Sequence, residues 1–282
     1  MSKTISPIIE VEELIKIHQL ENLVIVDASN ETSYKEKHLK GALFVNLNTQ
    51  LSNIKEDVSV GGRHPLPTIK QFSKTLKTLG INEKSQIVIY DDKNGANSAA
   101  RFWWMLRAIG HDKVQVLNGG IQEAERKGFP INSELVEAKK TASYNFVDYK
   151  LPQATIFEVE NCSQDKNYIV VDVREEERYL GIKEPLDLVA GHIPGAVNIP
   201  FSTNLDLNGL FKTSKELKNK YQTVFQNIES DHIIVHCGSG VTACHTLLAI
   251  AYAGLDIPKL YVGSWSEWSR NNKKIATINT NF

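Results

Sequence analysis

The same order of apolar runs and turns occurs twice along this chain of 282 residues. The apolar run that ends on Asp27 has a counterpart in the run that ends on Asp172, and the run that ends on Asp91 has one in the run that leads to Cys237. The members of the first pair lie 145 positions apart, and those of the second pair 146. An offset that stays nearly constant over successive elements indicates a tandem duplication. The chain is therefore expected to build one small fold twice.

Each half alternates short apolar runs, of the length of buried strands, with stretches of helical periodicity, such as residues 7–20 and 241–252. This alternation predicts the α/β fold class, with two tandem domains that each contain a mostly parallel sheet flanked by helices. We expect the first domain at residues 5–130 and the second at residues 153–282. The segment between them, residues 131–152, has few apolar residues and is expected to be a linker.

Composition excludes several classes of partner and location. The formal net charge is −1, which gives no indication of nucleic acid or of an anionic membrane surface as partner. No apolar run approaches the length of a membrane span, and the N-terminus has no apolar segment of the signal-peptide kind. We therefore expect a cytoplasmic protein that binds neither nucleic acid nor a membrane.

The cysteines are few and are expected to be reduced thiols. Three are present, Cys162, Cys237 and Cys244, and an odd, sparse set argues against a disulfide framework. No CxxC pair occurs, so a structural metal site is not expected. Cys244 follows the nucleophile candidate Cys237 by two helical turns, which favours a buried apolar role for it.

Cys237 lies where an apolar run, residues 233–235, meets a predicted helix. Backbone N–H groups and the helix dipole favour an anion at such a position, so Cys237 is predicted to be a thiolate nucleophile. In parallel α/β sheets ligands bind at the carboxyl ends of the strands, where both Cys237 and Asp91 are expected. Because Asp91 cannot act as a thiolate, the second half is predicted to carry the chemistry.

The residues after Cys237 are expected to form a ring of backbone N–H donors, Gly238, Ser239, Gly240, Val241 and Thr242. Such a ring binds a thiolate, a persulfide or a phosphate. Cysteine phosphatases place an arginine after these five residues to clamp the phosphoryl oxygens, and here the next residue is Ala243. This count argues against phosphoryl transfer.

The loop Cys237–Thr242 resembles the active-site loop of two-domain rhodanese-type sulfurtransferases. Gly238 and Ser239 are similar to the 3-mercaptopyruvate sulfurtransferases in particular, since thiosulfate-preferring rhodaneses carry basic residues at these two positions. Further landmarks of the family are spread over nearly the whole chain: Asp172-Val173-Arg174, Arg178-Tyr179-Leu180-Gly181, Gly191–Ala196, Gly263–Trp268 and Asn118-Gly119-Gly120. The resemblance implies two rhodanese-like domains, of which the first is not catalytic.

The resemblance also implies a reaction. Cys237 would take sulfane sulfur from a small anionic donor, 3-mercaptopyruvate or thiosulfate, and hold it as a persulfide. A thiol, such as that of a thioredoxin-like protein, or cyanide would then accept it, which is two-step covalent catalysis. No metal or organic cofactor is implied. The alternative is a persulfide carrier that delivers sulfur to a protein partner without processing a small donor.

By the same resemblance, Arg178 would hold the anionic group of the donor. Mercaptopyruvate-type members carry a second arginine just after a Glu-Pro pair, but here Glu184-Pro185 is followed by Leu186 and Asp187. A lysine, Lys183, lies nearby but is a point charge without the bidentate fork of arginine. The absent arginine leaves the choice between the two donors open.

Several other residues have two candidate roles. Ser239 either polarises the donor or relays a proton, or it is a small residue that a tight loop needs. Thr242 is expected to cap the following helix, and donation of its hydroxyl to the sulfur is the alternative. His38 and His192 occupy repeated positions, which favours structural hydrogen bonds. For His38, a contribution to the catalytic loop across the domain interface is the alternative.

Overall fold

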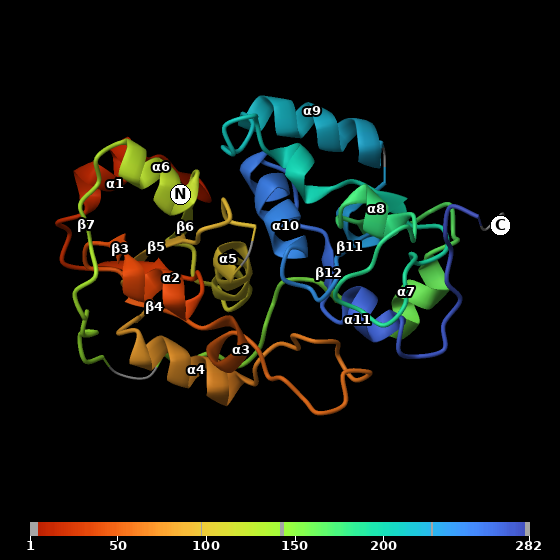
Figure 1. Cartoon of the computed structure of the whole chain (residues 1–282), viewed down its shortest axis with the longest axis horizontal. Helices are drawn as coiled ribbons and strands as arrows, with labels where there is room; N and C mark the ends of the chain where they lie inside the picture. Colours follow the sequence, from red (N-terminus) through yellow and green to blue (C-terminus); the bar gives the residue numbers. More distant parts are fainter. Residues whose placement is uncertain (1–4, 97, 142–143, 227, 280–282) are drawn as a thin grey trace. The chain divides into compact units, whose positions relative to one another are not determined.

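The computed structural model describes residues 5–96, 98–141, 144–226 and 228–279. The chain divides into two compact units (Figure 1). Unit 1 consists of the chain up to Asn53 together with Pro67–Lys150 and Leu207–Phe211. Unit 2 consists of Ile54–Leu66, Leu151–Asp206 and Lys212–Phe282. The predicted continuous limits, 5–130, 131–152 and 153–282, stay a prediction.

Unit 1 contains a five-stranded sheet in which all neighbouring strands are parallel. In sheet order its strands are β1 (Ile8–Ile9), β6 (Val114–Leu117), β5 (Gln86–Tyr90), β2 (Leu23–Asp27) and β4 (Leu43–Phe44). A separate antiparallel pair joins β3 (His38–Leu39) to β7 (Ile131–Asn132). Every residue of β6 is buried, as expected for a strand covered on both faces.

Unit 2 also contains a five-stranded parallel sheet. In sheet order its strands are β8 (Gln153–Ala154), β12 (Lys259–Tyr261), β11 (Ile233–His236), β9 (Ile169–Asp172) and β10 (Val197–Asn198). Taken by chain position, this is the strand order of unit 1. The predicted fold class, with two tandem α/β domains, is therefore confirmed.

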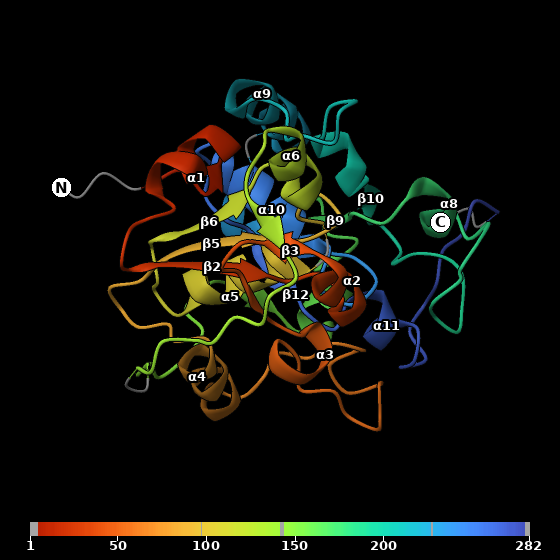
Figure 2. The ribbon, with the colours of Figure 1, turned by 60° about the vertical axis from the view of Figure 1, so that its left-hand side comes forward.

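Helices cover both faces of the unit 1 sheet. Figure 2 shows α1 (Val11–Ile17) and α6 (Gly120–Arg126) on one side of the strands, and α4 (Ile69–Thr78) and α5 (Ser98–Ala108) on the other. Buried side chains of α1 and α6, including Leu14 and Ala124, share one apolar core with the central strands. The short helices α2 (Glu31–Glu36) and α3 (Leu47–Gln50) follow β2 and β4.

The unit 2 helices include the one that follows the predicted nucleophile. In chain order they are α7 (Ile156–Cys162), α8 (Glu176–Tyr179), α9 (Ser214–Phe225), α10 (Ala243–Tyr252) and α11 (Ser264–Trp268), with short 3₁₀ turns at Phe201–Asn204 and Ser230–His232. Eight of the ten residues of α10 are buried, so it is a core helix. No helix among the described residues is long and apolar enough to cross a bilayer.

Two predicted helices begin later than expected. The helix predicted over residues 7–20 is α1, Val11–Ile17, because Ile8 and Ile9 pair with β6 as an edge strand. The helix predicted from Val241 begins at Ala243. The apolar residues just before the two helices belong to a strand (Ile8 and Ile9) and to a loop (Val241), which periodicity alone does not separate from a helix.

Each half of the chain contributes a short segment to the unit that the other half builds. Residues 54–66 belong to unit 2, where the Gly61 N–H donates to Glu267 at 2.8 Å and the Asn271 amide donates to the Ser59 carbonyl at 2.8 Å. Residues 207–211 belong to unit 1, where the Phe211 N–H donates to the Asn118 side chain at 2.9 Å. The sequence analysis did not predict this exchange.

Candidate active site

Cys237 lies at the carboxyl end of β11, the central strand of the unit 2 sheet, and is 3% exposed. Its carbonyl accepts a hydrogen bond from the Trp265 N–H at 3.0 Å, and the Gly238 carbonyl accepts one from Ser266 at 2.9 Å. The Cys237 N–H donates to the Ser264 hydroxyl at 3.2 Å. These contacts with the first turn of α11 fix the start of the loop that leads to α10.

The loop needs a glycine at position 240. Gly240 has φ +71°, and a Cβ there would lie 2.4 Å from the Val262 carbonyl oxygen. Any other residue would strain the backbone and collide with it. The predicted capping role of Thr242 is wrong in one respect: it occupies the N-cap position of α10, but its side chain makes no capping hydrogen bond with the described backbone. Its backbone is helical, which turns the side chain away from the capping position.

A buried ionic group lies at the carboxyl ends of β9 and β11, and consists of Asp172, Arg174 and His236. Asp172, at the end of β9, accepts hydrogen bonds from the Arg174 guanidinium at 2.6–3.0 Å, and His236 Nε2 lies 3.8 Å from its carboxylate. Burial alone would raise the pKa of Asp172, but the positive charge of Arg174 outweighs it and holds that pKa below its usual value. Burial lowers the pKa of His236, so its ring is neutral near pH 7. The group holds the ends of β9 and β11 together.

Three arginines surround one carboxylate beside the loop. Asp187 binds Arg63 Nε at 3.1 Å and Arg270 Nη1 at 2.9 Å, and its other oxygen lies 3.5 Å from Arg178 Nη2. Arg178 also donates to Glu184 at 2.8 and 3.2 Å. Together the three arginines bring more positive charge than the two carboxylates neutralise. The surroundings of the loop are therefore electropositive.

Ser239 has a histidine partner that the sequence analysis missed. The Ser239 hydroxyl lies 2.8 Å from His64 Nδ1, and both residues belong to unit 2. His64 and its neighbour Arg63 lie between Gly61-Gly62 and Pro65 in the sequence. The glycines before them and the prolines after them indicate a loop that presents two chemically active side chains, but they do not indicate the partner of either side chain.

His38 occupies a buried position in unit 1. Its Nδ1 lies 2.7 Å from the Tyr34 carbonyl oxygen and its Nε2 lies 3.1 Å from that of Glu134. The duplicated His192 makes the same 2.7 Å contact with the carbonyl oxygen of Tyr179, and in both units the histidine stacks on that tyrosine. The repeated geometry supports a structural role for both histidines, and a catalytic contribution of His38 stays a prediction.

The two remaining cysteines lie on helices α10 and α7. Cys244 is buried in α10, and its thiol donates to the Gly240 carbonyl at 3.4 Å. Cys162, half-buried in α7, has a pKa that burial raises. Neither favours a thiolate. No group of three or more His, Cys, Asp or Glu suited to a metal ion occurs among the described residues.

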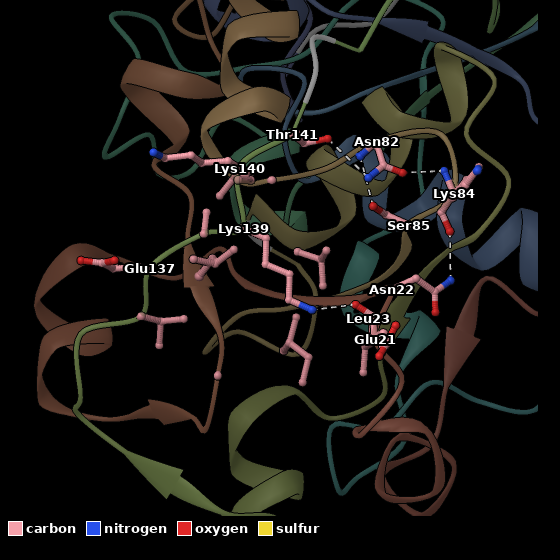
Figure 3. Close-up of a pocket in the computed structure, with 18 of the residues that line it drawn as sticks. Glu21, Asn22, Leu23, Asn82, Lys84, Ser85, Glu137, Lys139, Lys140 and Thr141 are labelled. Carbon is pink, nitrogen blue, oxygen red and sulfur yellow. Dashed lines mark hydrogen bonds between the residues drawn. The ribbon is translucent and has the colours of Figure 1, made fainter.

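A pocket of about 530 Å³ lies in unit 1, away from Asp91, at the amino ends of β2 and β5 (Figure 3). Its polar groups bond to one another: Lys139 Nζ donates to the Glu21 carbonyl at 2.9 Å, and the Asn22 amide donates to that of Lys84 at 3.0 Å. Ligands of parallel sheets bind at the carboxyl ends of the strands, so this pocket is not a candidate for the reaction.

Fold and site together define a duplicated α/β protein. The loop after β11 carries a cysteine, Cys237, and the corresponding loop of unit 1 carries Asp91. The model of the rhodanese-like domain matches residues 10–127 and 156–271. The chain belongs to the rhodanese-like domain family, in two tandem copies. The prediction of two rhodanese-like domains is confirmed.

Named relatives are sulfurtransferases. A probable 3-mercaptopyruvate sulfurtransferase of Pseudomonas aeruginosa is 37% identical over 254 residues, which cover 86% of each chain. Thiosulfate sulfurtransferase of Gallus gallus is 35% identical and covers 86% of this chain and 81% of its own. The solved 3-mercaptopyruvate sulfurtransferase of Leishmania major has a TM-score of 0.80 at 28% identity, covering 93% of this chain and 74% of its own. These findings confirm the prediction of a sulfurtransferase enzyme.

Proposed function

We propose that this protein transfers sulfane sulfur from 3-mercaptopyruvate or thiosulfate to a thiol or to cyanide through a persulfide on Cys237. The observation that carries the proposal is the joint placement, on one loop, of a cysteine at the end of the central strand, a Ser239–His64 contact and adjacent arginines. The names of the relatives support both donors.

In the first step, the Cys237 thiolate attacks the donor sulfur and forms an S–S bond. With 3-mercaptopyruvate, the donor's carbon–sulfur bond breaks, and its electron pair forms the enolate of pyruvate, which takes up a proton. We propose that the Ser239 hydroxyl, which lies 2.8 Å from His64 Nδ1, supplies that proton. With thiosulfate, the sulfur–sulfur bond of the donor breaks and sulfite leaves with the electron pair.

In the second step, an acceptor thiolate or cyanide attacks the outer sulfur of the persulfide. The S–S bond to Cys237 breaks and its electron pair restores the thiolate. Between the two steps the persulfide anion would be held by the N–H groups of Gly238, Ser239, Gly240, Val241 and Thr242. We propose a protein thiol of the thioredoxin type, in the cytoplasm, as one acceptor.

Arg178 is proposed to bind the anionic group of the donor. A Cβ on Gly238 would lie 3.3 and 3.5 Å from its Nη2 and Nη1 atoms, so its guanidinium faces the residue next to Cys237. The ion pairs with Glu184 and Asp187 orient the group, and its side chain keeps 18% exposure. Arginine matches a carboxylate with two parallel hydrogen bonds, which suits an α-keto acid.

Intact-protein mass spectrometry tests the proposal. The reduced protein is mixed with 3-mercaptopyruvate or with thiosulfate, and the mass is followed before and after addition of cyanide. We expect a gain of one sulfur atom that cyanide removes and that Cys237→Ala does not show. No gain with either donor would refute the proposal.

The alternative is a carrier that takes a persulfide only from a protein partner. It predicts no loading from either small donor, but rapid loading from a persulfidated protein. The guanidinium groups of Arg63 and Arg178 both lie beside Gly238, and a carrier does not require two such groups. This favours the enzyme with small donors.

A further inference from the structure

Residues 136–141, which the sequence predicts to be part of a linker, form one wall of the pocket in unit 1. The segment is held to this unit by the pairing of β7 with β3 and by Lys139 Nζ, which donates to the Glu21 carbonyl at 2.9 Å. Gly80, with φ +66°, lies so close that a Cβ there would be 2.5 Å from the Lys139 carbonyl oxygen. A side chain at position 80 would push this wall away, so glycine allows the pocket to form.

The interior of the pocket is largely apolar. Its apolar lining comes from β2, β4, the end of α4 and the linker wall, and includes Leu23, Ile25, Leu43, Leu79 and Val136. Leu23, Leu43 and Val136 are only half-buried and are therefore accessible to a ligand. The volume of about 530 Å³ suits a small organic molecule. A ligand that covers these side chains needs an apolar body, because burial of apolar surface then supplies much of the binding free energy.

Lysine side chains dominate the charge around the pocket. Four lysines and two glutamates line it: Lys40, Lys84, Lys139 and Lys140, and Glu21 and Glu137. None of the four ammonium groups forms an ion pair with a carboxylate of the residues that the structure describes. Figure 3 shows the Lys139 side chain crossing the pocket toward Glu21, where its ammonium group donates to the carbonyl oxygen. An ammonium group has three N–H groups, so two remain for an anion.

We propose that this pocket binds a small organic anion with an apolar body, of the class of medium-chain carboxylates. The carboxylate would accept hydrogen bonds from Lys139, and the chain would lie against Leu23, Leu43 and Val136. The other three lysines are exposed and raise the local concentration of an anion. The pocket lies at the amino ends of β2 and β5, and the inference does not depend on the proposed sulfur transfer.

Titration of the full-length protein, followed by its amide NMR signals at low ionic strength, tests the inference with three matched probes. Hexanoate has both an apolar chain and an anionic end, hexylammonium reverses the charge, and inorganic phosphate lacks the chain. We expect hexanoate to bind at least about tenfold more tightly than either of the others, with a Kd of about 1 mM. Added salt should weaken hexanoate binding, because it screens the exposed lysines.

Two pairs of variants locate the ligand. Lys139→Ala removes the ammonium group in the pocket, and Lys74→Ala removes an exposed one on α4 that does not line it. We expect the affinity for hexanoate to fall about three- to tenfold in the first and less than about twofold in the second. Val136→Glu places a carboxylate on the apolar wall, whereas Leu135→Glu adds the same charge at a neighbouring position that is 87% exposed. Only the first of these should weaken hexanoate binding by more than about tenfold.

Thermal unfolding establishes that each variant is folded, and the Lys139 pair keeps the test decisive if Val136→Glu is not. Equal affinity for hexanoate and hexylammonium, or an equal loss in Lys139→Ala and Lys74→Ala, would overturn the inference. The same holds if hexanoate causes no signal changes up to about 20 mM, well above the expected Kd, or if it shifts only signals outside the pocket. Sulfur transfer can be present or absent in any of these cases, so failure here is distinct from failure of the proposed function.

Discussion

The two halves of the molecule contain the same strand-to-helix loop, but a different residue lies at its start. In unit 1 the Asp91 carboxylate, fully buried, accepts hydrogen bonds from the N–H groups of Lys93 at 2.9 Å, Gly95 at 2.8 Å and Ala99 at 3.1 Å. In unit 2 the corresponding position is Cys237, whose side chain is too short to reach around the loop in this way. One loop binds its own anion, whereas the other is proposed to bind an anion made during the reaction.

The charged residues around the two loops also differ. Arg174 and Arg178 of unit 2 correspond in position to the uncharged residues Ser29 and Ser33 of unit 1. Ser29 bonds to Asp27, and Ser33 bonds to Asn30 and Asp92. We propose that the loop binds an anion in both units, and that in unit 2 the arginines attract this anion from solution. This difference is open to direct tests.

The largest effect is expected from making the second loop like the first. In Cys237→Asp a resident carboxylate would accept the loop N–H groups, as in unit 1, and no sulfur atom could be held. We expect sulfur transfer to fall by about a thousandfold or more with an unchanged fold. Steady-state kcat/KM with each donor and circular dichroism check this. A residual rate near that of the unmodified protein would show that Cys237 is not the nucleophile.

A smaller effect is expected at Ser239, which unit 1 replaces with Lys93. In Ser239→Ala the contact with His64 is lost. We expect kcat with 3-mercaptopyruvate to fall by about ten- to a hundredfold, because the enolate loses its proton source. With thiosulfate we expect little change, since sulfite leaves without a proton. An equal loss with both donors would mean that Ser239 supports the loop rather than the proton transfer.

The smallest effect on catalysis is expected in unit 1. Asp91→Asn replaces the charged acceptor of three backbone N–H groups with a neutral one, and should lower the free energy of unfolding by about 1–3 kcal/mol. At temperatures where the variant is folded, kcat/KM should stay unchanged. Urea titration and steady-state kinetics measure the two quantities. Unchanged stability would contradict the account of Asp91 as a resident anion.

The sequence by itself determined the duplication, the parallel α/β class and the position of Cys237. These follow from local pattern: strand-like runs that recur at a constant offset, and a cysteine between an apolar run and a glycine-bearing turn. Each run and the turn after Cys237 depend on neighbouring residues only, and the duplication follows from comparing the sequence with itself. The family landmarks then made sulfur transfer the expected reaction, and the relatives confirmed the class.

Tertiary structure alone decided which distant side chains lie beside the loop that follows Cys237. Residues 54–66 lie in the first half of the sequence but belong to unit 2, so His64 meets Ser239 across 175 positions and Arg63 meets Asp187 across 124. A local pattern carries no information on contacts at that separation. These contacts depend on the close approach of Gly62 to the start of α11, where a Cβ would lie 2.3 Å from the Gly263 carbonyl oxygen. This packing contact sets the position of residues 54–66. The guanidinium of Arg63 beside Gly238 is therefore evident only from the three-dimensional structure.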